Sequence, residues 1–237
     1  MSKLRTIKMS LKIRFPRLYE GVKACIPATR RQERALMGRS AQEVFTSIYQ
    51  NKGWRSAESA SGDGSTLEFT QPLRGALPGF LAELGVRVFL DAPCGDFNWM
   101  RRVHLGVDRY IGADIVPEMI ERLQREYAND SRSFFVLNIL SEPLPEADAL
   151  FCRDCLRHLS LNDVSAVLKN AKRSRCRYFI ASTCAKVKLN IDIATGGSRP
   201  LNLCLPPFNL PPPIKEINDG DGGPERRTMG VWRIDQL

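Results

Sequence analysis

The sequence of 237 residues lacks several features that define whole classes of protein. It has only two histidines, and its seven cysteines show no regular spacing. No stretch reaches the roughly 18 consecutive apolar residues that a membrane-spanning helix needs. The most apolar stretch, residues 75–94, is interrupted by Glu83, Arg87 and Asp91. These absences argue against a membrane span and a disulfide framework, and we expect no bound metal.

Cysteine usage is typical of reduced thiols in a cytosolic protein, because the start of the chain also lacks the pattern of a secretory signal. We therefore expect a cytoplasmic location. The segment "CRDC" at residues 152–155 has the C-x-x-C spacing of some metal and redox sites. It has no second cysteine pair and no neighbouring histidine cluster, so this role is the minor alternative.

Acidic residues are scarce in the first 40 residues, where eleven Lys and Arg stand against two Glu. This excess equals the net charge of +9, so the remaining chain is balanced. A protein that binds nucleic acid usually has a basic face on its body, and we therefore do not favour a nucleic-acid partner.

Residues 1–40 are expected to form a separate basic arm. Its apolar residues recur three or four positions apart, as on one face of a helix, although Pro16 divides the pattern. We consider three interpretations of this arm: a segment that lies on an anionic membrane surface, an organellar transit peptide, or a solvated terminus. The pattern is formed by Leu4, Ile7, Leu11, Phe15, Leu18 and Val22.

Residues 41–72 are expected to contain a helix followed by a Ser/Gly-rich segment. Val44, Phe45, Ile48 and Tyr49 share one helix face, and the following stretch contains Trp54 among serines and glycines. This segment is either a lid over a ligand or a plain connection.

From residue 73 to residue 237, strand-like and helix-like stretches alternate. Apolar strand patterns separated by helical patterns indicate βαβ units and a parallel sheet. The predicted fold is α/β, a mostly parallel sheet with helices on both faces. The C-terminal "MGVWRIDQL" is expected to be an antiparallel last strand. Strands are predicted within 86–93, 109–115, 134–139, 147–154 and 177–183, and helices within 78–84, 97–103, 116–130 and 161–174.

Polar residues gather just after the predicted strands. Ligands of open parallel sheets bind beyond the carboxyl ends of the strands, so these side chains are expected to meet at one edge. Asp114 follows Asp91 by 23 residues, close to the roughly 20 that separate a Rossmann turn from the acid that binds ribose. Asn138 follows the next strand, and Arg153 and Asp154 follow the one after.

The turn after the first strand is a poor phosphate-binding loop. A dinucleotide fingerprint would place three glycines where this chain has Pro93, Gly95 and Asn98. An acidic turn with one glycine suits a ligand with ribose, adenine and a cationic tail. Asp91 could accept from the tail, and Gly95 lets the backbone approach closely.

These segments resemble class I S-adenosylmethionine-dependent methyltransferases. "VFLDAPCGDF" and "YIGADIVPEMIERLQREY" are similar to the first two motifs of that family, and residues 134–140 and 146–173 match the third strand and the fourth strand with its helix. A narrower resemblance, to a bacterial-type group with "DAPCGDFNWM" and "RPLNL…PPF", covers residues 45–237. Pro93 and Phe97 stand where many family members have glycine.

The resemblance implies a seven-stranded, Rossmann-like sheet with an antiparallel last strand, an S-adenosylmethionine cofactor and a methyltransferase domain in residues 73–237. It implies that the turn after the first strand surrounds the methionine part, that Asp114 binds the ribose, and that Asn138 and Ile139 lie beside the adenine. The cofactor-binding residues expected on this basis are Asp91, Ala92, Pro93, Cys94, Gly95, Asp114, Ile115, Asn138, Ile139 and Arg153.

Methyl transfer to a hydroxyl needs a group that takes the proton, and Asp154 and His158 are the catalytic candidates. They would share one helix face if the helix after the fourth predicted strand began by Asp154. His158 could equally have a structural role, as a cap of that helix or as a packed side chain. Arg153 could neutralise an acidic substrate or the cofactor carboxylate, or form a structural ion pair.

The acceptor is expected to be a small molecule or a carbohydrate. Arg199 and Asn202, in the proline-rich tail, offer donors for such an acceptor, and Trp54 could stack on it; surface packing of the tail is the alternative. Two other functions stay open: a non-catalytic module that binds the cofactor or a membrane, and a nicotinamide-dependent oxidoreductase, against which the missing glycines argue. The oligomeric state does not follow from the sequence.

If the basic arm is directed to membranes, the full chain should sediment with anionic liposomes and a variant without residues 1–40 should not. The attraction of Lys and Arg to anionic lipid gives this expectation. A full-length chain that stays in the supernatant would dispose of the idea.

Overall fold

The computed structural model describes residues 15, 17–18, 36, 38–220 and 226–237. The expected basic arm therefore lies almost entirely outside the described residues. In the part of the chain that the structure describes, no helix has the length and apolar character needed to cross a membrane.

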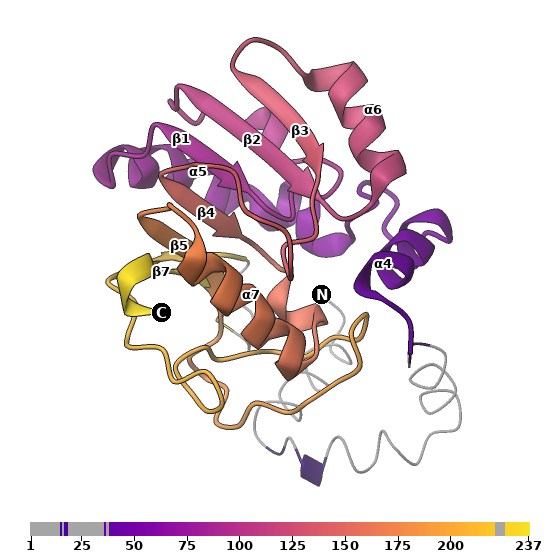
Figure 1. The fold of residues 1–237 in the computed structure, drawn as a ribbon, viewed down its shortest axis with the longest axis vertical. Helices are drawn as coiled ribbons and strands as arrows, with labels where there is room; N and C mark the ends of the chain where they lie inside the picture. Colours follow the sequence, from indigo (N-terminus) through magenta and orange to yellow (C-terminus); the bar gives the residue numbers. More distant parts are fainter. Residues whose placement is uncertain (1–14, 16, 19–35, 37, 221–225) are drawn as a thin grey trace.

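One mixed sheet forms the centre of the molecule (Figure 1). Its strands are β1 (Val88–Asp91), β2 (Arg109–Asp114), β3 (Arg132–Val136), β4 (Ala149–Cys152), β5 (Tyr178–Thr183), β6 (Lys215–Asn218) and β7 (Thr228–Arg233). The seven strands lie in the order β3-β2-β1-β4-β5-β7-β6. The first five are parallel, and β7 is antiparallel to both of its neighbours. This confirms the predicted Rossmann-like, mostly parallel sheet with an antiparallel last strand.

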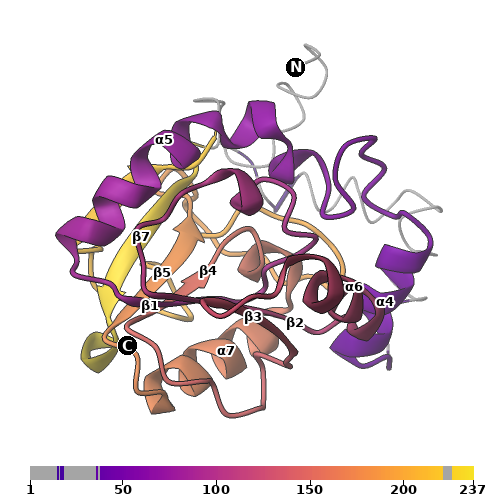
Figure 2. The same cartoon turned by 90° about the horizontal axis from the view of Figure 1, so that it is seen from above.

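Helices cover both faces of the sheet (Figure 2). They are α4 (Ala41–Gln50), α5 (Leu67–Glu83), α6 (Pro117–Tyr127) and α7 (Leu161–Arg173). Apolar side chains of α5 and α6 pack into one core, and those of α7 pack into a second core on the opposite face. Within β1, Phe89 belongs to the first core and Leu90 to the second, and both are fully buried. Central strands between two helix layers bury both faces, which explains why residues 88–90 of β1 and 149–152 of β4 are apolar.

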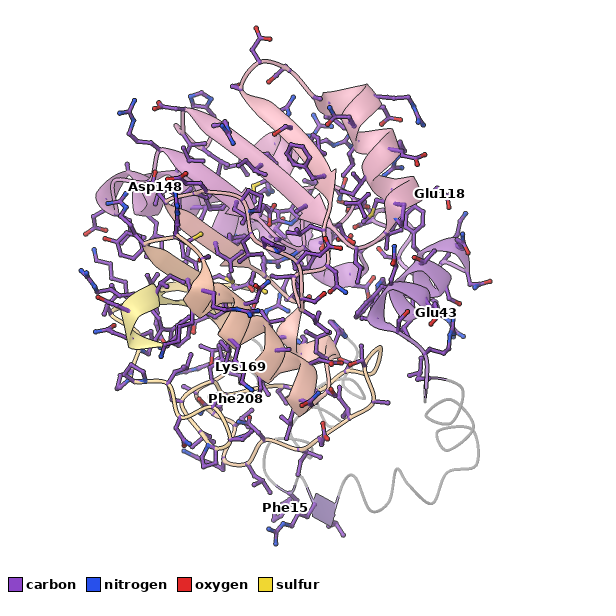
Figure 3. All side chains as sticks on the ribbon, viewed as in Figure 1. Phe15, Glu43, Glu118, Asp148, Lys169 and Phe208 are labelled. Carbon is purple, nitrogen blue, oxygen red and sulfur yellow. The ribbon has the colours of Figure 1, made fainter. Side chains whose placement is uncertain are left out.

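Helix α4 lies beside the start of α6. Figure 3 shows Glu118 of α6 next to α4, and its carboxylate accepts a hydrogen bond from Gln50 Nε2 at 3.5 Å. Ser40 begins α4 with a capping box, in which its hydroxyl accepts from the Glu43 N–H and the Glu43 carboxylate accepts from the Ser40 N–H. The hydrogen bond to Glu118 links α4 to the start of α6, which follows the carboxyl end of β2.

The helix predicted over residues 97–103 is wrong. Only a single 3-10 turn, Met100–Arg102, follows β1. Phe97 has a φ of 60°, in the left-handed region, which a continuing α-helix does not allow. Its ring packs 5.3 Å from Tyr110, 5.5 Å from Tyr127 and 5.1 Å from Phe134, measured between centroids. An aromatic cluster therefore takes the place of the expected helix.

The helix predicted over residues 78–84 starts much earlier, at Leu67. Thr66 caps it by accepting from the Phe69 N–H at 3.3 Å, and the helix contains both Pro72 and Pro78. Leu73, Leu77 and Leu81 are fully buried against the sheet, so packing outweighs the backbone hydrogen bonds that the prolines remove. Helix α5 thus crosses the predicted division between residues 72 and 73.

The last predicted helix, α7, begins at Leu161 and is capped by Ser160, whose hydroxyl accepts from the Asp163 N–H at 3.1 Å. It does not begin by Asp154, because Asp154 has a φ of 52°. The proline-rich residues 198–214 have no regular secondary structure, and they lead into a strand, β6, that the sequence did not predict.

We expect Gly112→Ala to destabilise the protein by about 1–3 kcal/mol. Gly112 lies in β2, and a Cβ there would stand 2.5 Å from the Phe134 ring, which is held in the aromatic cluster. Gly75→Ala is the matched control, because Gly75 lies in α5 with open space around it and alanine should stabilise the helix by about 0.5–1 kcal/mol. Urea titration of both variants measures the difference; equal stabilities would contradict this packing.

Candidate functional site

The turn after β1 is tied to both neighbouring strands. The Ala92 N–H donates to the Phe151 carbonyl at 2.9 Å, and the Cys94 N–H donates to the Ala113 carbonyl at 2.8 Å. Gly95 has a φ of 56°, and a Cβ at this position would collide with the Ser61 hydroxyl. Gly95 is therefore required both by its backbone conformation and by the close approach of another segment.

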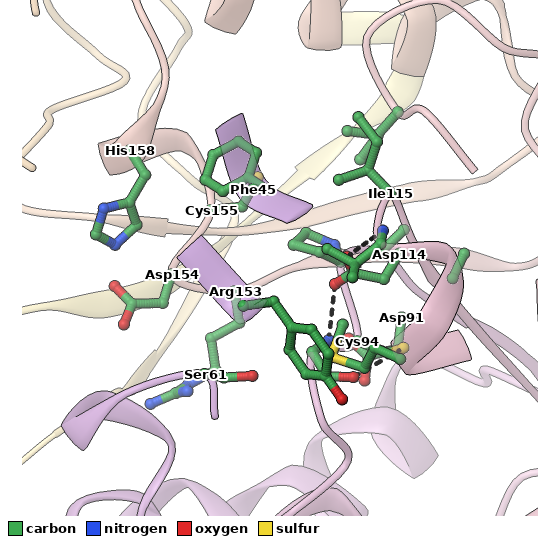
Figure 4. A pocket seen from close by; sticks show the side chains of 18 of the residues that line it. Phe45, Ser61, Asp91, Cys94, Asp114, Ile115, Arg153, Asp154, Cys155 and His158 are labelled. Carbon is green, nitrogen blue, oxygen red and sulfur yellow. Dashed lines mark hydrogen bonds between the residues drawn. The ribbon is translucent and has the colours of Figure 1, made fainter. Parts of the chain in front are cut away.

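Two carboxyl groups are buried at this edge of the sheet. Asp91 is 3% exposed and accepts from the Tyr110 hydroxyl at 2.6 Å. Asp114 accepts from the Val116 N–H at 3.2 Å and from the Gly95 N–H at 3.1 Å, as Figure 4 shows. Burial raises the pKa of Asp91 to about 7 and that of Asp114 to about 6. Neither carboxylate has a cationic partner at hydrogen-bonding distance among the described residues, so the site favours a positively charged ligand.

Residues 58–65, here called the covering segment, lie over the turn after β1. The Asp96 carboxylate accepts from the Ser59 hydroxyl at 2.9 Å and from the Ala60 N–H at 2.7 Å. In return, the Asp96 N–H donates to the Ser61 hydroxyl at 2.9 Å. Sequence reasoning missed this function of Asp96.

A second anchor holds the covering segment at both ends. The Asn98 side-chain amide donates to the Glu58 carboxylate at 2.7 Å and to the Ser65 carbonyl at 3.1 Å. Sequence reasoning also missed Asn98 and Glu58. The signal available was the presence of two short polar residues, Asp96 and Asn98, in an otherwise buried motif.

Five charged side chains form a buried ion-pair cluster at the end of β4: Arg153, Asp154, Arg157, Asp219 and Arg227. Asp219 is fully buried and pairs with Arg153 at 2.8 Å and with Arg227 at 2.9 Å. Asp154 pairs with Arg227 and, at 3.7 Å, with Arg157. These cations hold the pKa of Asp154 well below its usual range against the opposing effect of burial. Asp154 is therefore a permanent carboxylate and a weak base.

Arg153 connects the cluster to the covering segment and the β1 turn. Its Nη2 donates to the Gly64 carbonyl at 2.7 Å, and its guanidinium lies 5.1 Å from the centroid of the Trp99 ring. The structural ion pair considered for Arg153 is present, and the side chain also lines the cavity described below.

His158 has a fixed tautomer. Its Nδ1 lies 2.8 Å from the Gly197 carbonyl, which can only accept, so Nδ1 carries the proton and Nε2 has a free lone pair. Burial lowers the pKa of His158 to about 4, so the ring is neutral at physiological pH. The Trp54 ring packs against it with centroids 4.7 Å apart. Figure 4 shows the His158 ring beside the Asp154 carboxylate.

One cavity of about 1090 Å³, including its open mouth, joins these groups. The structure brings most predicted site residues to it: Trp54, Asp91, Ala92, Pro93, Cys94, Gly95, Asp114, Ile115, Ile139, Arg153, Asp154 and His158. The helical face predicted to bring Asp154 and His158 together is absent. Instead, the left-handed backbone at Asp154 and the turn Leu156–His158 bring them there.

Three predicted site residues are not among those that line the cavity: Asn138, Arg199 and Asn202. The Asn138 side chain accepts from the Leu140 N–H at 3.0 Å. Arg199 is 2% exposed and donates to the Ile191 and Arg157 carbonyls, and Asn202 donates to the Val187 carbonyl at 3.1 Å. The donors expected to contact an acceptor are therefore used to fold the tail.

We expect Asp91→Asn to stabilise the protein at pH 8 by about 2–4 kcal/mol. Because the pKa of Asp91 is raised in the folded state, protonation of Asp91 stabilises the native parent protein. This stabilisation is fully present below the unfolded pKa of about 4 and is lost as pH rises through the folded pKa near 7. Asparagine cannot ionise, so the difference between the variant and the parent should shrink towards pH 4. Denaturant unfolding at several pH values measures it, with the exposed Asp130→Asn as control; a difference independent of pH would contradict the assignment.

Comparisons with known proteins agree with this fold. Residues 89–175 match a family model described as "Methyltransferase domain". No protein of curated function matches the sequence. Among solved structures, magnesium protoporphyrin IX methyltransferase from Synechocystis PCC 6803 with bound SAM has a TM-score of 0.58 at 14% identity, covering 83% of this chain and 99% of that one.

Two further structures show the same fold. Human N-acetylserotonin methyltransferase in complex with SAM has a TM-score of 0.58 at 13% identity, covering 83% of this chain; the chain spans only 60% of the human protein. The 1,6-didemethyltoxoflavin-N1-methyltransferase of Burkholderia thailandensis has a TM-score of 0.56 at 17% identity, covering 86% of this chain and 89% of that one. Residues 89–175 are thus similar to a methyltransferase domain, and the chain shares the Rossmann-like fold of these three methyltransferase structures.

Proposed function

We propose that this protein transfers the methyl group of S-adenosylmethionine to a hydroxyl oxygen of a small molecule. The observation that carries the proposal is the placement of Asp114 and His158 in one cavity, which can hold a nucleoside at one end and a base at the other. The cofactor supplies an electrophilic methyl group on a sulfonium; the protein supplies position and a proton acceptor.

The residues present fit this cofactor. Asp114 keeps lone pairs for ribose hydroxyls beyond those used by Val116 and Gly95. Ile115, Leu137 and Ile139 line an apolar part of the cavity that suits the adenine ring. Asp91 and Asp114, whose pKa values are raised by burial, gain from the positive charge of the methionine part.

Arg153 is the residue that we assign to the cofactor carboxylate. It lines the cavity, and it donates from Nε to Asp219 and from Nη2 to the Gly64 carbonyl. Nη1 can donate into the cavity without loss of either bond. The covering segment, docked on Arg153 and on Asp96, would then close over the methionine part.

His158 is the proton acceptor in this proposal. Its Nε2 lone pair is available because Nδ1 donates to Gly197. The ionised Asp154 beside it stabilises the imidazolium that forms, in the way that it already raises the pKa of His158 against the effect of burial. Both side chains line the cavity, which weighs against a non-catalytic module.

The proposal does not favour a carbohydrate. Arg199 and Asn202, the expected sugar-binding donors, contact the main-chain carbonyls of Ile191 and Val187 instead. A nicotinamide cofactor is disfavoured because the turn after β1 has one glycine where a pyrophosphate needs several. Contact of residues 1–40 with a membrane and a cytoplasmic location are proposals that rest on the sequence alone.

Isothermal titration calorimetry with S-adenosylmethionine and with NAD tests the proposed function. We expect binding of S-adenosylmethionine and none of NAD. Asp114→Ala should weaken S-adenosylmethionine binding by about tenfold or more, since a charged hydrogen bond contributes about 1.5–3 kcal/mol. The exposed Asp130→Ala, measured beside it, should leave the affinity unchanged. Binding of NAD alone would refute the proposal, and an unchanged affinity in Asp114→Ala would remove the ribose assignment.

A further inference from the structure

Resting on the proposed function, we propose that the methyl acceptor is a small uncharged aromatic compound with a hydroxyl on its ring, held by Trp54 and Phe45 with that hydroxyl at His158. The proposal concerns the part of the cavity next to Asp154 and His158, away from Asp114. It names a substrate class that the family match leaves open.

Aromatic side chains from the N-terminal part of the chain form one wall of the cavity. Phe45 and Tyr49 come from α4, and Trp54 follows that helix; all three are half-buried and line the cavity. Figure 4 shows Phe45 between His158 and Ile115. Partly exposed rings in a concave site gain most from a flat aromatic ligand, which buries apolar area and stacks on them.

The position of Trp54 is fixed from two sides. Its ring packs on the His158 ring, with centroids 4.7 Å apart and planes tilted by 54°. On another side, Gly62 of the covering segment leaves so little room that a Cβ there would lie 3.1 Å from the Trp54 Cβ. A ligand ring that contacts Trp54 is therefore brought next to the imidazole edge.

The charged groups at this end already have partners. Asp154 pairs with Arg227 and Arg157. Arg153 pairs with Asp219 and, in the proposed function, also with the cofactor carboxylate, which leaves it no donor for the acceptor. The other titratable carboxyls that line the cavity in the described part of the chain, Asp91 and Asp114, lie at the β1 and β2 ends, on the cofactor side. A charged acceptor would lose its hydration here without gaining an ion pair, so the site selects an uncharged molecule.

The base at this site is weak, and a weak base needs an acidic hydroxyl. The neutral His158 ring has its pKa lowered to about 4 by burial. A phenol has a pKa of about 10, whereas a water-like hydroxyl has a pKa of about 16. The proton transfer is therefore about a million times less unfavourable from a ring hydroxyl than from an aliphatic alcohol or a sugar.

The reaction balances with these groups. The acceptor oxygen uses a lone pair to form a bond to the methyl carbon, and the carbon–sulfur bond breaks with its electron pair going to sulfur. The hydroxyl proton passes to Nε2 of His158 and then to solvent. The products are an aryl methyl ether and the uncharged thioether of the cofactor.

A matched series of acceptors tests the inference with the full chain and S-adenosylmethionine that carries a tritiated methyl group. The series consists of 2-naphthol, its saturated analogue decahydro-2-naphthol, the charged 6-hydroxy-2-naphthoate, and methyl glucopyranoside. We expect 2-methoxynaphthalene from 2-naphthol, and kcat/KM lower by about 100-fold or more for the other three. Equal or faster transfer to decahydro-2-naphthol, to the glucoside or to the carboxylate would overturn the proposal.

Variants separate binding of the ring from removal of the proton. His158→Gln should lower kcat by about 100-fold or more with little change in KM for 2-naphthol. His104→Gln, on the exposed histidine outside the cavity, is its control. Trp54→Leu should raise KM by about tenfold, and Trp54→Phe should restore it. Unchanged kinetics in both His158→Gln and Trp54→Leu would contradict the assigned contacts.

Calorimetry with S-adenosylmethionine distinguishes the two levels of failure. If S-adenosylmethionine does not bind, the proposed function fails and the acceptor inference fails with it. If it binds and no methyl group reaches 2-naphthol, the acceptor inference alone is overturned. Thermal unfolding of each variant shows whether it is folded. If His158→Gln does not fold, the pair Trp54→Leu and Trp54→Phe still tests the contact with the acceptor ring.

Discussion

The buried carboxylate of Asp219 is the interaction on which the arrangement of the site depends. It lies between the guanidinium groups of Arg153 and Arg227, which without it would be cations in a region from which water is excluded. Breaking a buried ion pair by removing one partner typically costs about 3–5 kcal/mol, because the other charge is left uncompensated. Arg153 also binds Gly64, and Arg227 also binds Asp154. The Asp219 carboxylate therefore fixes the connection between β6 and β7, the end of β4 and the covering segment relative to each other.

The sheet could be predicted because its signals are local. Apolar stretches such as residues 88–91 and 149–152 are short and continuous, and each is followed by a polar turn. In a parallel sheet the ends of such strands meet at one edge whatever fills the space between them, so Asp91 and Asp114 could be placed without knowledge of the helices. The helix expected after β1 could not be predicted correctly, because the left-handed backbone of Phe97 depends on ring contacts with β2, β3 and α6.

The contacts that complete the site join residues far apart in the sequence. Asp96 binds Ser59 across 37 residues, and Arg153 binds Asp219 across 66. No pattern of spacing predicts such pairs, and a lone acid or arginine in a loop has many possible partners. The same limit explains why Arg199 and Asn202 were expected in the cavity: a donor in an extended tail looks available until the main-chain carbonyls that it satisfies are known.

The two ends of the cavity are built from different kinds of structure. The end with Asp91 and Asp114 is formed by strand ends in the middle of the sheet, and the end with Trp54 and Phe45 is formed by a peripheral helix and the loop after it. Strand ends vary little without loss of the fold, whereas a peripheral segment can change its side chains at small cost to stability. This division allows one fold to keep its cofactor while its acceptor changes.

Burial of Asp91 and Asp114 also makes the cavity respond to the charge of the molecule inside it. Near neutral pH these carboxyls hold a fraction of a proton when no cation is present, since their pKa values are near 7 and 6. A ligand with a positive sulfur displaces that proton, so its affinity is linked to proton release. In the proposed reaction, methyl transfer would remove the positive charge from sulfur, and the same carboxyls would then regain protons and attract the product less than the cofactor. Asp91 and Asp114 would thereby act as counterions that are neutralised by protonation once per turnover, which would help the demethylated cofactor to dissociate.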